Sequence, residues 1–254
     1  MVIIKTPQQI KLMAEAGKIL TTCHRELRKI IRPGITTMQI NQFVDDFIQS
    51  HGAKAEQKGY HGYPFAICAS VNDEICHGFP TQTPLREGDI VTIDMVVNLN
   101  GWMADSAWSY PVGQITEQAK QLLEVTKECL YLGIDKAVIG NRLGDISHAI
   151  QIHAESHGFS VVREFTGHGI GHNMHEDPQV LHYGHPNKGL RLSEGMVFTI
   201  EPMINLGSYD LTIDQNGWTA RTADGSLSAQ YEHTIAITKN GPLVLTEQGL
   251  KKVR

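Results

Sequence analysis

Few features of a secreted or membrane-spanning protein occur in this sequence. The four cysteines are scattered and form no Cys-x-x-Cys pair, which indicates reduced thiols rather than a disulfide framework. The longest apolar runs have the length of a strand and are interrupted by polar residues such as Asp94 and Thr199, which excludes a transmembrane helix. The N-terminus lacks the long apolar core of a signal peptide. We therefore expect a cytoplasmic protein without a membrane partner.

An excess of positive charge is also missing. The net charge is −5, so no basic field would attract nucleic acid, and we expect none to bind. The 254 residues are enough for one large hydrophobic core. Histidine, in contrast, is plentiful, and five of the 13 histidines lie within 18 positions: His168, His172, His175, His182 and His185. Such a cluster is typical of a metal or acid/base site, and equally of a polar surface loop.

One short stretch occurs twice. The segment from Glu87 to Asp94 (EGDIVTID) is repeated as EGMVFTIE, which ends at Glu201, 107 residues after Asp94. Both copies are β-branched and apolar, which predicts strands, yet each ends on an acid where a core residue is expected. A buried carboxylate needs a cation, a partner or a proton. Two acids at equivalent places therefore suggest that both bind one shared, positively charged group.

The helical segments repeat as well. A threonine cap followed by Pro7 predicts a first helix that ends at Pro33-Gly34, and a second helix is expected from Thr37 to Ser50. The later chain shows the same plan, with helices predicted from 116 onward and from about 143 to 156. Residues 50–52 and 156–158 both read Ser-His-Gly. An internal duplication of one supersecondary unit explains these matches, and its two copies would face each other across a pseudo-twofold axis.

The residues after Asp94 predict a hairpin. Asn100-Gly101 lies between two apolar runs, which is a strong signal for a two-residue turn. With that turn, Asp105 lies opposite Val96, so Asp94 and Asp105 project from the same face as diagonal neighbours. A slip of one residue would separate them. Two acids so close would repel each other unless a cation lay between them.

The second half offers a counterpart acid, Glu232, in a predicted strand over residues 228–237. The 31 residues between Glu201 and Glu232 exceed the 11 between their counterparts, and the excess, with Trp218, predicts an added hairpin that walls a pocket. Residues 166–172 (TGHGIGH) do not complete a phosphate-binding fingerprint. We interpret their glycines as allowing a close backbone approach, with His168 pointing into a site.

These residues resemble one family closely. Five of them, in the contexts TID, ADSA, TGHGIG, TIEP and QYEHT, resemble the metal ligands of type I methionine aminopeptidases: Asp94, Asp105, His168, Glu201 and Glu232. The resemblance covers nearly the whole chain, including YHGYP from Tyr60 and CHGFP from Cys76. It implies an α+β, pita-bread fold, in which two pseudo-symmetric αβ halves form a curved, largely antiparallel sheet backed by helices. We expect one domain over residues 1–254, with halves of roughly 1–112 and 113–254.

The ligand set suits hard or borderline divalent ions. Four carboxylates and one imidazole favour Mn²⁺, Fe²⁺, Co²⁺, Ni²⁺ or Zn²⁺, and four negative charges balance two such ions. The resemblance implies that Asp105 and Glu232 bridge the two ions, that Asp94 serves one ion, and that His168 and Glu201 serve the other. It also implies that Glu201 accepts a proton during the reaction.

Further site residues follow from the same resemblance. His175 is expected to stabilise the developing oxyanion, and His77 to hold the scissile amide or assist the leaving amine. A small apolar slot for a methionine side chain is expected from five residues, which could equally be ordinary core: Tyr60, Tyr63, Cys68, Met174 and Trp218.

The sequence therefore predicts a methionyl aminopeptidase, a metallohydrolase that removes the initiator methionine from new polypeptides whose second residue is small. Nascent N-termini are its expected partners, the ribosome is a candidate partner, and we expect a monomer. Two alternatives stay open. One is a proline-directed peptidase of the same fold, although such enzymes carry an extra N-terminal domain for which Asp94 comes too early. The other is a non-catalytic binding module, which should have lost some of these residues.

Overall fold

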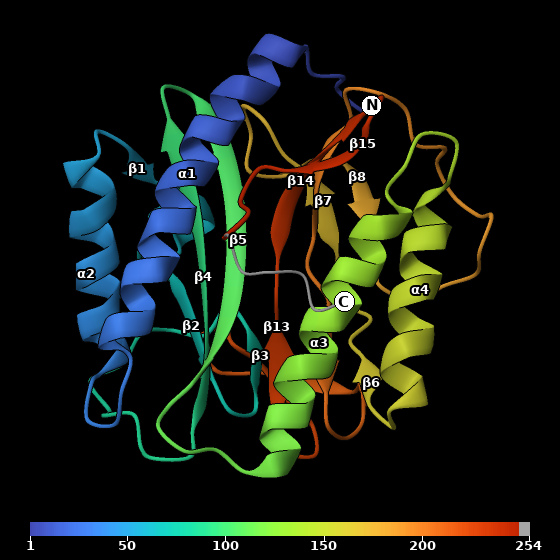
Figure 1. Ribbon diagram of the computed structural model, residues 1–254. Coiled ribbons are helices and arrows are strands. Elements are labelled where there is room, and N and C mark those ends of the chain that lie inside the picture. Colours follow the sequence, from blue (N-terminus) through green and yellow to red (C-terminus); the bar gives the residue numbers. More distant parts are fainter. Residues whose placement is uncertain (249–254) are drawn as a thin grey trace.

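The computed structural model describes residues 1–248, which fold into four helices and a set of antiparallel strands (Figure 1). The expected single domain extends to residue 254, so its last six residues lie outside the described part. The helical elements are α1 (Pro7–Ile30), α2 (Thr37–Ser50), η1 (a 3-10 turn, Tyr60–Gly62), α3 (Glu117–Lys136) and α4 (Leu143–Ser156). The strands are β1 (Lys54–Ala55), β2 (Cys68–Val71), β3 (Glu74–Cys76), β4 (Ile90–Leu99), β5 (Trp102–Pro111), β6 (Ser160–Val161), β7 (Gly167–Gly169), β8 (Glu176–Val180), β9 (Val197–Ile200), β10 (Met203–Asn205), β11 (Leu211–Ile213), β12 (Ala220–Thr222), β13 (Ser228–Gln230), β14 (His233–Thr238) and β15 (Gly241–Val244).

The four predicted helices are confirmed, together with the duplicated way in which two of them end. Helix α1 starts with a capping box, in which Thr6 and Gln9 exchange hydrogen bonds between side chain and backbone. At the end of α2, the side chains of Ser50 and His51 both contact the carbonyl oxygen of Phe47, at 2.7 and 2.8 Å. The equivalent serine and histidine at the end of α4 make the same contacts. The repeated Ser-His-Gly string therefore encodes the same helix ending twice.

The predicted hairpin is confirmed in its register. Strands β4 and β5 pair antiparallel along their whole length, and Asn100 and Gly101 form the turn with positive φ angles, as a two-residue turn requires. Val96 lies opposite Asp105. Since Asp94 and Val96 share a face, Asp94 and Asp105 also project from the same face, toward the centre of the molecule.

The second half departs from the prediction at both of its acids. The strand expected to end on Glu201 stops one residue earlier, at Ile200, because Pro202 follows and has no N–H to donate to a sheet. The strand expected over residues 228–237 is broken into β13, which pairs with β10, and β14, which pairs with β9. Glu232 lies in the break, and its N–H donates to the carbonyl of Ala107 at 2.8 Å. Both acids therefore lie where the chain leaves one sheet.

The sheets occupy the middle of the molecule and the helices cover them (Figure 1). Every strand pairing within residues 1–248 is antiparallel. Helix α1 packs on β4 and β5, whereas α3 packs on β9, β10 and β13, and α4 lies beside α3. One continuous hydrophobic core contains residues from both halves, such as Leu20 and Ile93 with Leu122 and Phe198. The α+β architecture expected from the sequence is confirmed.

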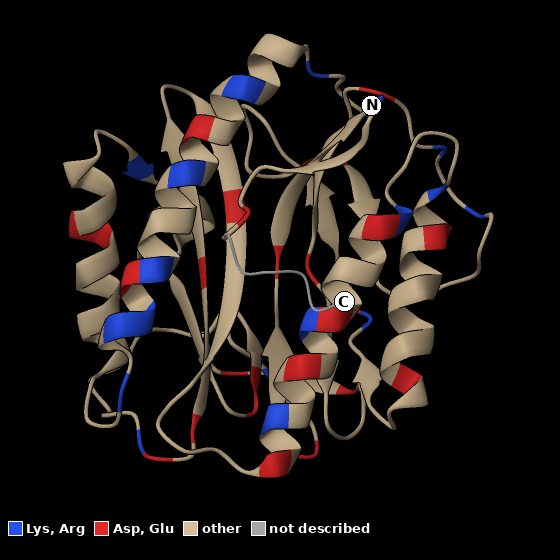
Figure 2. Cartoon of the chain, in the orientation of Figure 1, with Lys and Arg blue, Asp and Glu red and all other residues tan. Residues whose placement is uncertain are grey.

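Charge is distributed unevenly between these layers. Helices α1 and α3 carry acidic and basic residues side by side, and α2 and α4 carry acidic residues but no lysine or arginine (Figure 2). The central strands β4, β5, β9, β13 and β14 also contain no lysine or arginine. Two acids, Asp94 and Asp105, lie within β4 and β5; Glu201 directly follows β9, and Glu232 directly precedes β14. Within residues 1–248, acidic groups without an ion pair to lysine or arginine thus gather at the centre of the sheet layer. No helix within residues 1–248 combines the length and the apolar character needed to cross a bilayer.

Candidate metal centre

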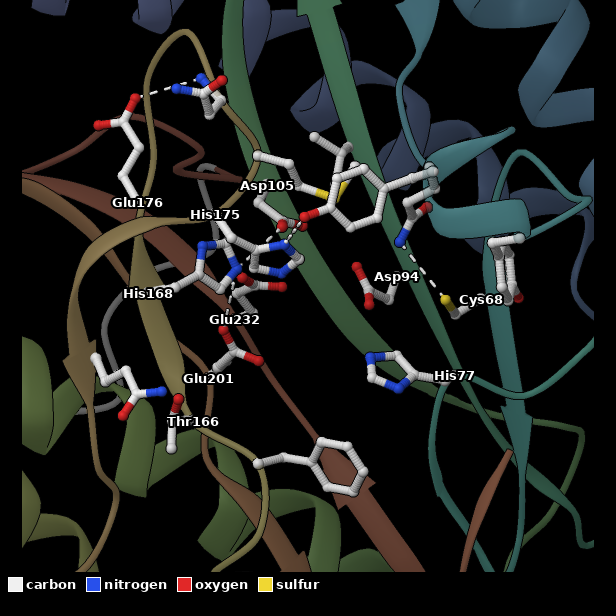
Figure 3. Close-up of a pocket in the computed structure, with 18 of the residues that line it drawn as sticks. Cys68, His77, Asp94, Asp105, Thr166, His168, His175, Glu176, Glu201 and Glu232 are labelled. Atoms are coloured by element: carbon white, nitrogen blue, oxygen red, sulfur yellow. Dashed lines mark hydrogen bonds and ion pairs between the residues drawn. The ribbon is translucent and has the colours of Figure 1, made fainter. Parts of the chain in front are cut away.

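A cavity of about 710 Å³ opens between the two halves. The structure brings all twelve residues singled out from the sequence to its wall (Figure 3): Tyr60, Tyr63, Cys68, His77, Asp94, Asp105, His168, Met174, His175, Glu201, Trp218 and Glu232. Residues that the sequence did not single out also line it, among them Phe165 and Gln179. Distant parts of the chain therefore share one site.

The acidic residues meet one imidazole at the bottom of the cavity. Asp105, His168 and Glu232 each offer a ligand atom within 4.8 Å of the others. The Nε2 atom of His168 lies 3.6 Å from Asp105 Oδ2 and 3.6 Å from Glu201 Oε1. The other ring nitrogen of His168, Nδ1, lies 3.0 Å from the carbonyl oxygen of Gly169. The Nδ1–H group donates a hydrogen bond to this oxygen, and the hydrogen bond fixes the orientation of the ring. Nε2 is thereby the ring nitrogen directed at the carboxylates, and it could bind a metal ion once it has lost its proton.

These carboxylates lack the partners that buried acids need. Among the residues that the structure describes, Asp94 Oδ1, Asp105 Oδ1 and Glu232 Oε1 are buried without a hydrogen bond. Burial and the neighbouring acids raise the pKa values of Asp94 and Glu232 well above their ordinary range. Divalent cations would satisfy these orphaned oxygens and balance their charge. The residues present therefore fit a metal centre.

The titration of Glu201 and His168 reflects the same crowding. Burial raises the pKa of Glu201 from 4.5 to about 7, although the charge of His168 opposes the shift. Burial by itself would lower the pKa of His168, but its contact with Asp105 and the charge of Glu201 raise that pKa to about 9. The metal-free site is thus short of positive charge, and it retains protons to compensate.

The raised pKa of Glu201 predicts how the stability of the metal-free protein responds to pH. Below pH 4.5 the carboxyl is protonated in both the folded and the unfolded state, and above its folded pKa it is ionised in both. Between about pH 4.5 and 7 the Glu201 carboxyl is ionised in the unfolded state but still protonated in the folded state. The burial of Glu201 therefore destabilises the folded state by an amount that grows as the pH rises through this window. We expect Glu201→Gln to gain stability over the wild type across this window, by up to roughly 3 kcal/mol at about 1.4 kcal/mol per pKa unit.

Urea unfolding of the metal-free proteins at a series of pH values measures this difference. Replacement of an exposed acid on α4, Glu155→Gln, is the control and should follow the wild-type profile. Profiles of Glu201→Gln and wild type that stay parallel from pH 4.5 to 7 would contradict the assignment of a raised pKa to Glu201.

Two threonines that the sequence did not reveal as site residues hold three of the candidate ligands in place. The hydroxyl of Thr199 donates to Glu201 Oε1 at 2.6 Å and accepts the N–H of His168 at 2.9 Å. Thr234 lies on β14 and contacts both the N–H and the carbonyl of Asp105 on β5, each at 2.9 Å. Thr199 belongs to the repeated Thr-Ile pair, and that repetition was the signal that could have identified it. Nothing in the sequence marked Thr234.

The glycines around His168 act as the sequence predicted. A Cβ atom on Gly167 would lie 2.5 Å from the carbonyl oxygen of Thr199, and one on Gly169 would lie 2.1 Å from that of Asp177. Any side chain at these positions would push β7 away from its neighbours β9 and β8. His168 therefore reaches the site because the backbone on both sides of it has no side chain.

The five clustered histidines separate in the structure. His168 and His175 line the cavity, and their ring centroids are 4.2 Å apart. His182 is buried behind the site, where its Nε2 accepts the N–H of Glu201 at 3.1 Å. His172 stacks on Trp102 and His185 is exposed, and neither lines the cavity. The polar-loop interpretation thus holds for His172 and His185. His182 supports Glu201 from behind the site, and the sequence did not predict this role.

His77 and His175 flank the carboxylates (Figure 3). Burial, joined by the charge of His168, lowers the pKa of His175 to about 4, and its Nδ1 lies 2.7 Å from the hydroxyl of Tyr60. Burial also lowers the pKa of His77, although Asp105 opposes the shift. The His77 ring meets Phe165 edge-on at a centroid distance of 5.2 Å. Both imidazoles are therefore neutral near pH 7 and can each donate one hydrogen bond.

An aromatic and sulfur-containing wall adjoins the carboxylates. Tyr63 packs edge-on against Trp218, with ring centroids 5.1 Å apart, and Cys68 and Met174 are buried beside the cavity. Trp218 lies between β11 and β12, which form the added hairpin predicted from the long excursion. Arg221 on β12 ties this hairpin down through contacts with Asp73, Glu74 and Asp214. Aromatic rings and sulfur atoms therefore line the cavity beside the carboxylates.

Comparison with known proteins agrees with this geometry. The sequence profile of Metallopeptidase family M24 matches residues 11–239. The chain belongs to metallopeptidase family M24. This M24 peptidase is 51% identical over 246 residues to methionine aminopeptidase 1 of Bacillus subtilis, covering 97% of the chain and 99% of that protein. It is also 49% identical to the methionine aminopeptidase of Clostridium perfringens, with the same coverage of both chains.

Solved structures show the same relationship. The crystal structure of methionine aminopeptidase from Rickettsia prowazekii superposes on this M24 peptidase with a TM-score of 0.96 and 44% identity, covering 97% of this chain and all of that one. The prolidase from Pyrococcus furiosus is similar at a TM-score of 0.78 and 22% identity, and the match covers 65% of it. The prolidase likeness shows the shared pita-bread fold alone. The fold and the family predicted from the sequence are confirmed.

Proposed function

We propose that this metallopeptidase removes the N-terminal methionine from polypeptides whose second residue is small. Its relatives at 44–51% identity are named methionine aminopeptidases and match over nearly their whole length. The observation that carries the proposal is the cluster of unpartnered buried carboxylate oxygens beside an aromatic and sulfur-lined wall. The cluster supplies a place for metal ions, and the wall supplies a place for a thioether side chain.

The proposed centre holds two divalent ions of manganese, iron, cobalt, nickel or zinc. Asp105 and Glu232 would bridge the ions, Asp94 would bind one of them, and His168 with Glu201 would bind the other. Four carboxylates offer the charge that two such ions require. When bound, the ions would polarise the scissile carbonyl and lower the pKa of water for attack on it.

The chain's own groups would do the remaining work. Glu201 holds a carboxylate within the site that can take up a proton. A neutral His175 would donate a hydrogen bond to the oxygen on which negative charge develops, and His77 would hold the scissile amide. The rings of Tyr60, Tyr63 and Trp218, with Cys68 and Met174, would surround the methionine side chain and exclude water from it.

We also propose a single-domain, monomeric, cytoplasmic enzyme that acts on nascent N-termini, with the ribosome as a candidate partner. The continuous core across both halves supports one domain. All four cysteines are free thiols, which supports a reducing compartment. The proposed substrate is the N-terminus of a newly made chain, and this is the reason for including the ribosome.

Hydrolysis of two tripeptides tests the proposed function. Metal-free protein titrated with Mn²⁺ or Co²⁺ should cleave Met-Ala-Ser and leave Met-Leu-Ser nearly intact, with a ratio of kcat/KM of at least about 100, because a larger second side chain clashes beyond the scissile bond. Ala-Pro-Pro serves as the substrate of a proline-directed peptidase and should not be cleaved. Preference for Ala-Pro-Pro, or metal binding without cleavage of any of the three, would overturn the proposal.

A further inference from the structure

A hydrogen bond joins the expected methionine slot to the expected oxyanion site. The hydroxyl of Tyr60 lies 2.7 Å from Nδ1 of His175, although the two residues are 115 positions apart. Their rings are 5.2 Å apart at the centroids and inclined by 47°. Tyr60 begins the short turn η1, which Gly59 starts with a φ of 92°. The turn therefore brings the phenol hydroxyl to Nδ1 of the imidazole.

The contact links the tautomer of His175 to the direction in which the Tyr60 hydroxyl hydrogen-bonds. A neutral imidazole has one N–H donor and one lone-pair acceptor, and the partner of one nitrogen sets the state of the other. Within residues 1–248, the Tyr60 hydroxyl is the hydrogen-bond partner that the structure gives to the His175 ring, and His175 is the partner that it gives to that hydroxyl. A phenol that donates to Nδ1 leaves the proton on Nε2.

We propose that the Tyr60 hydroxyl fixes the tautomer of His175, so that Nδ1 accepts its hydrogen bond and Nε2–H is the donor offered to the cavity. The inference rests on the proposed function, in which His175 stabilises an oxyanion. In the opposite tautomer, Nε2 would present a lone pair to a negatively charged oxygen and repel it. Tyr60 is thus a positioning residue that acts through His175, in addition to the place of its ring in the slot.

The hydroxyl and the ring of Tyr60 can be tested separately, because Tyr60→Phe removes only the hydroxyl. We expect kcat for Met-Ala-Ser to fall about tenfold, the size of one net hydrogen bond, while KM changes less than about twofold because the ring remains. Tyr209→Phe is the matched control, since Tyr209 is exposed and its ring lies over Arg163, away from the cavity. Thermal unfolding of each variant checks that the fold is kept.

A double-mutant cycle with His175 tests whether Tyr60 acts through it. If Tyr60 acts through His175, Tyr60→Phe should lower kcat about tenfold in the wild type and leave kcat almost unchanged in the His175→Gln background. Equal losses in both backgrounds would mean that the phenol contacts the substrate itself, and would overturn the inference. An unchanged kcat in Tyr60→Phe, beside an active wild type, would overturn it as well.

The tautomer can be read directly by ¹⁵N nuclear magnetic resonance of the histidine rings in the protein loaded with diamagnetic Zn²⁺. Signals that disappear in His175→Gln identify that ring. We expect a pyridine-like Nδ1 and a pyrrole-like Nε2 in the wild type, and a mixture of tautomers in Tyr60→Phe. A protonated Nδ1 in the wild type would overturn the inference even if the enzyme is active. A wild type that does not cleave Met-Ala-Ser would instead refute the proposed function and leave the tautomer to be judged by these spectra.

Discussion

Asp105→Asn is expected to lower kcat/KM for Met-Ala-Ser by on the order of 10³-fold or more, because metal ions in such sites supply several kcal/mol of transition-state stabilisation. The carboxylate of Asp105 lies 3.6 Å from His168 Nε2 and has a buried oxygen without a hydrogen bond among the described residues. We propose that it bridges both ions, so its loss should reduce the number of ions bound and not only the rate. Metal content after dialysis and calorimetric titration with Mn²⁺ measure that number.

The fold should survive this substitution. Thr234 contacts the backbone N–H and carbonyl of Asp105, and these contacts do not involve the carboxylate. Removal of one charge from a crowded acidic cluster should leave the metal-free variant at least as stable as the wild type, whereas the stability gained on adding metal should shrink. Asp46→Asn, an exposed change on α2, is the control and should alter neither quantity. Wild-type metal stoichiometry in Asp105→Asn would refute the bridging role.

His175→Ala is expected to lower kcat by about 10²- to 10³-fold with little change in KM, the loss observed when one donor to an oxyanion is removed. The ring lies beside His168 but is not itself among the proposed metal ligands, so metal stoichiometry should stay at the wild-type value. Single-turnover and steady-state rates with Met-Ala-Ser measure the effect on kcat and KM separately.

A neighbouring histidine provides the matched control for this prediction. His172 lies three residues earlier, stacks on Trp102 with ring centroids 3.7 Å apart, and does not line the cavity. His172→Ala should therefore retain wild-type kinetics. If His175→Ala raised KM and left kcat unchanged, the ring would bind the substrate equally in the ground and transition states, and the oxyanion role would be wrong.

Local sequence signals proved reliable where neighbouring residues alone decide the structure. The caps of α1 and α2, the identical endings of α2 and α4, and the two-residue turn at Asn100-Gly101 were all predictable, because each depends on contacts within a few positions. The turn also determined the pairing of β4 with β5, and with it the common face of Asp94 and Asp105. The repeated strand indicated which acids belong together.

Other features required the tertiary structure. The strands predicted to carry Glu201 and Glu232 end before these residues, because the chain changes sheets there and the N–H of Glu232 bonds across to Ala107 of the other half. A periodic pattern marks an apolar strand but does not reveal where its hydrogen-bonding partner changes. The ends of β9 and β13 were therefore beyond sequence reasoning.

The supporting contacts behind the site were equally hidden. Thr234 joins Asp105 across 129 positions, His182 accepts the N–H of Glu201, and the Tyr60 hydroxyl reaches His175 across 115 positions. The sequence by itself determined which groups to expect together in one site, because metal ligands and oxyanion donors must be particular residue types, and these groups do line one cavity. Only the tertiary structure decided how those groups are held and that the Tyr60 hydroxyl meets Nδ1 of His175, because a hydrogen bond depends on the positions of two atoms that the chain brings together only when it folds.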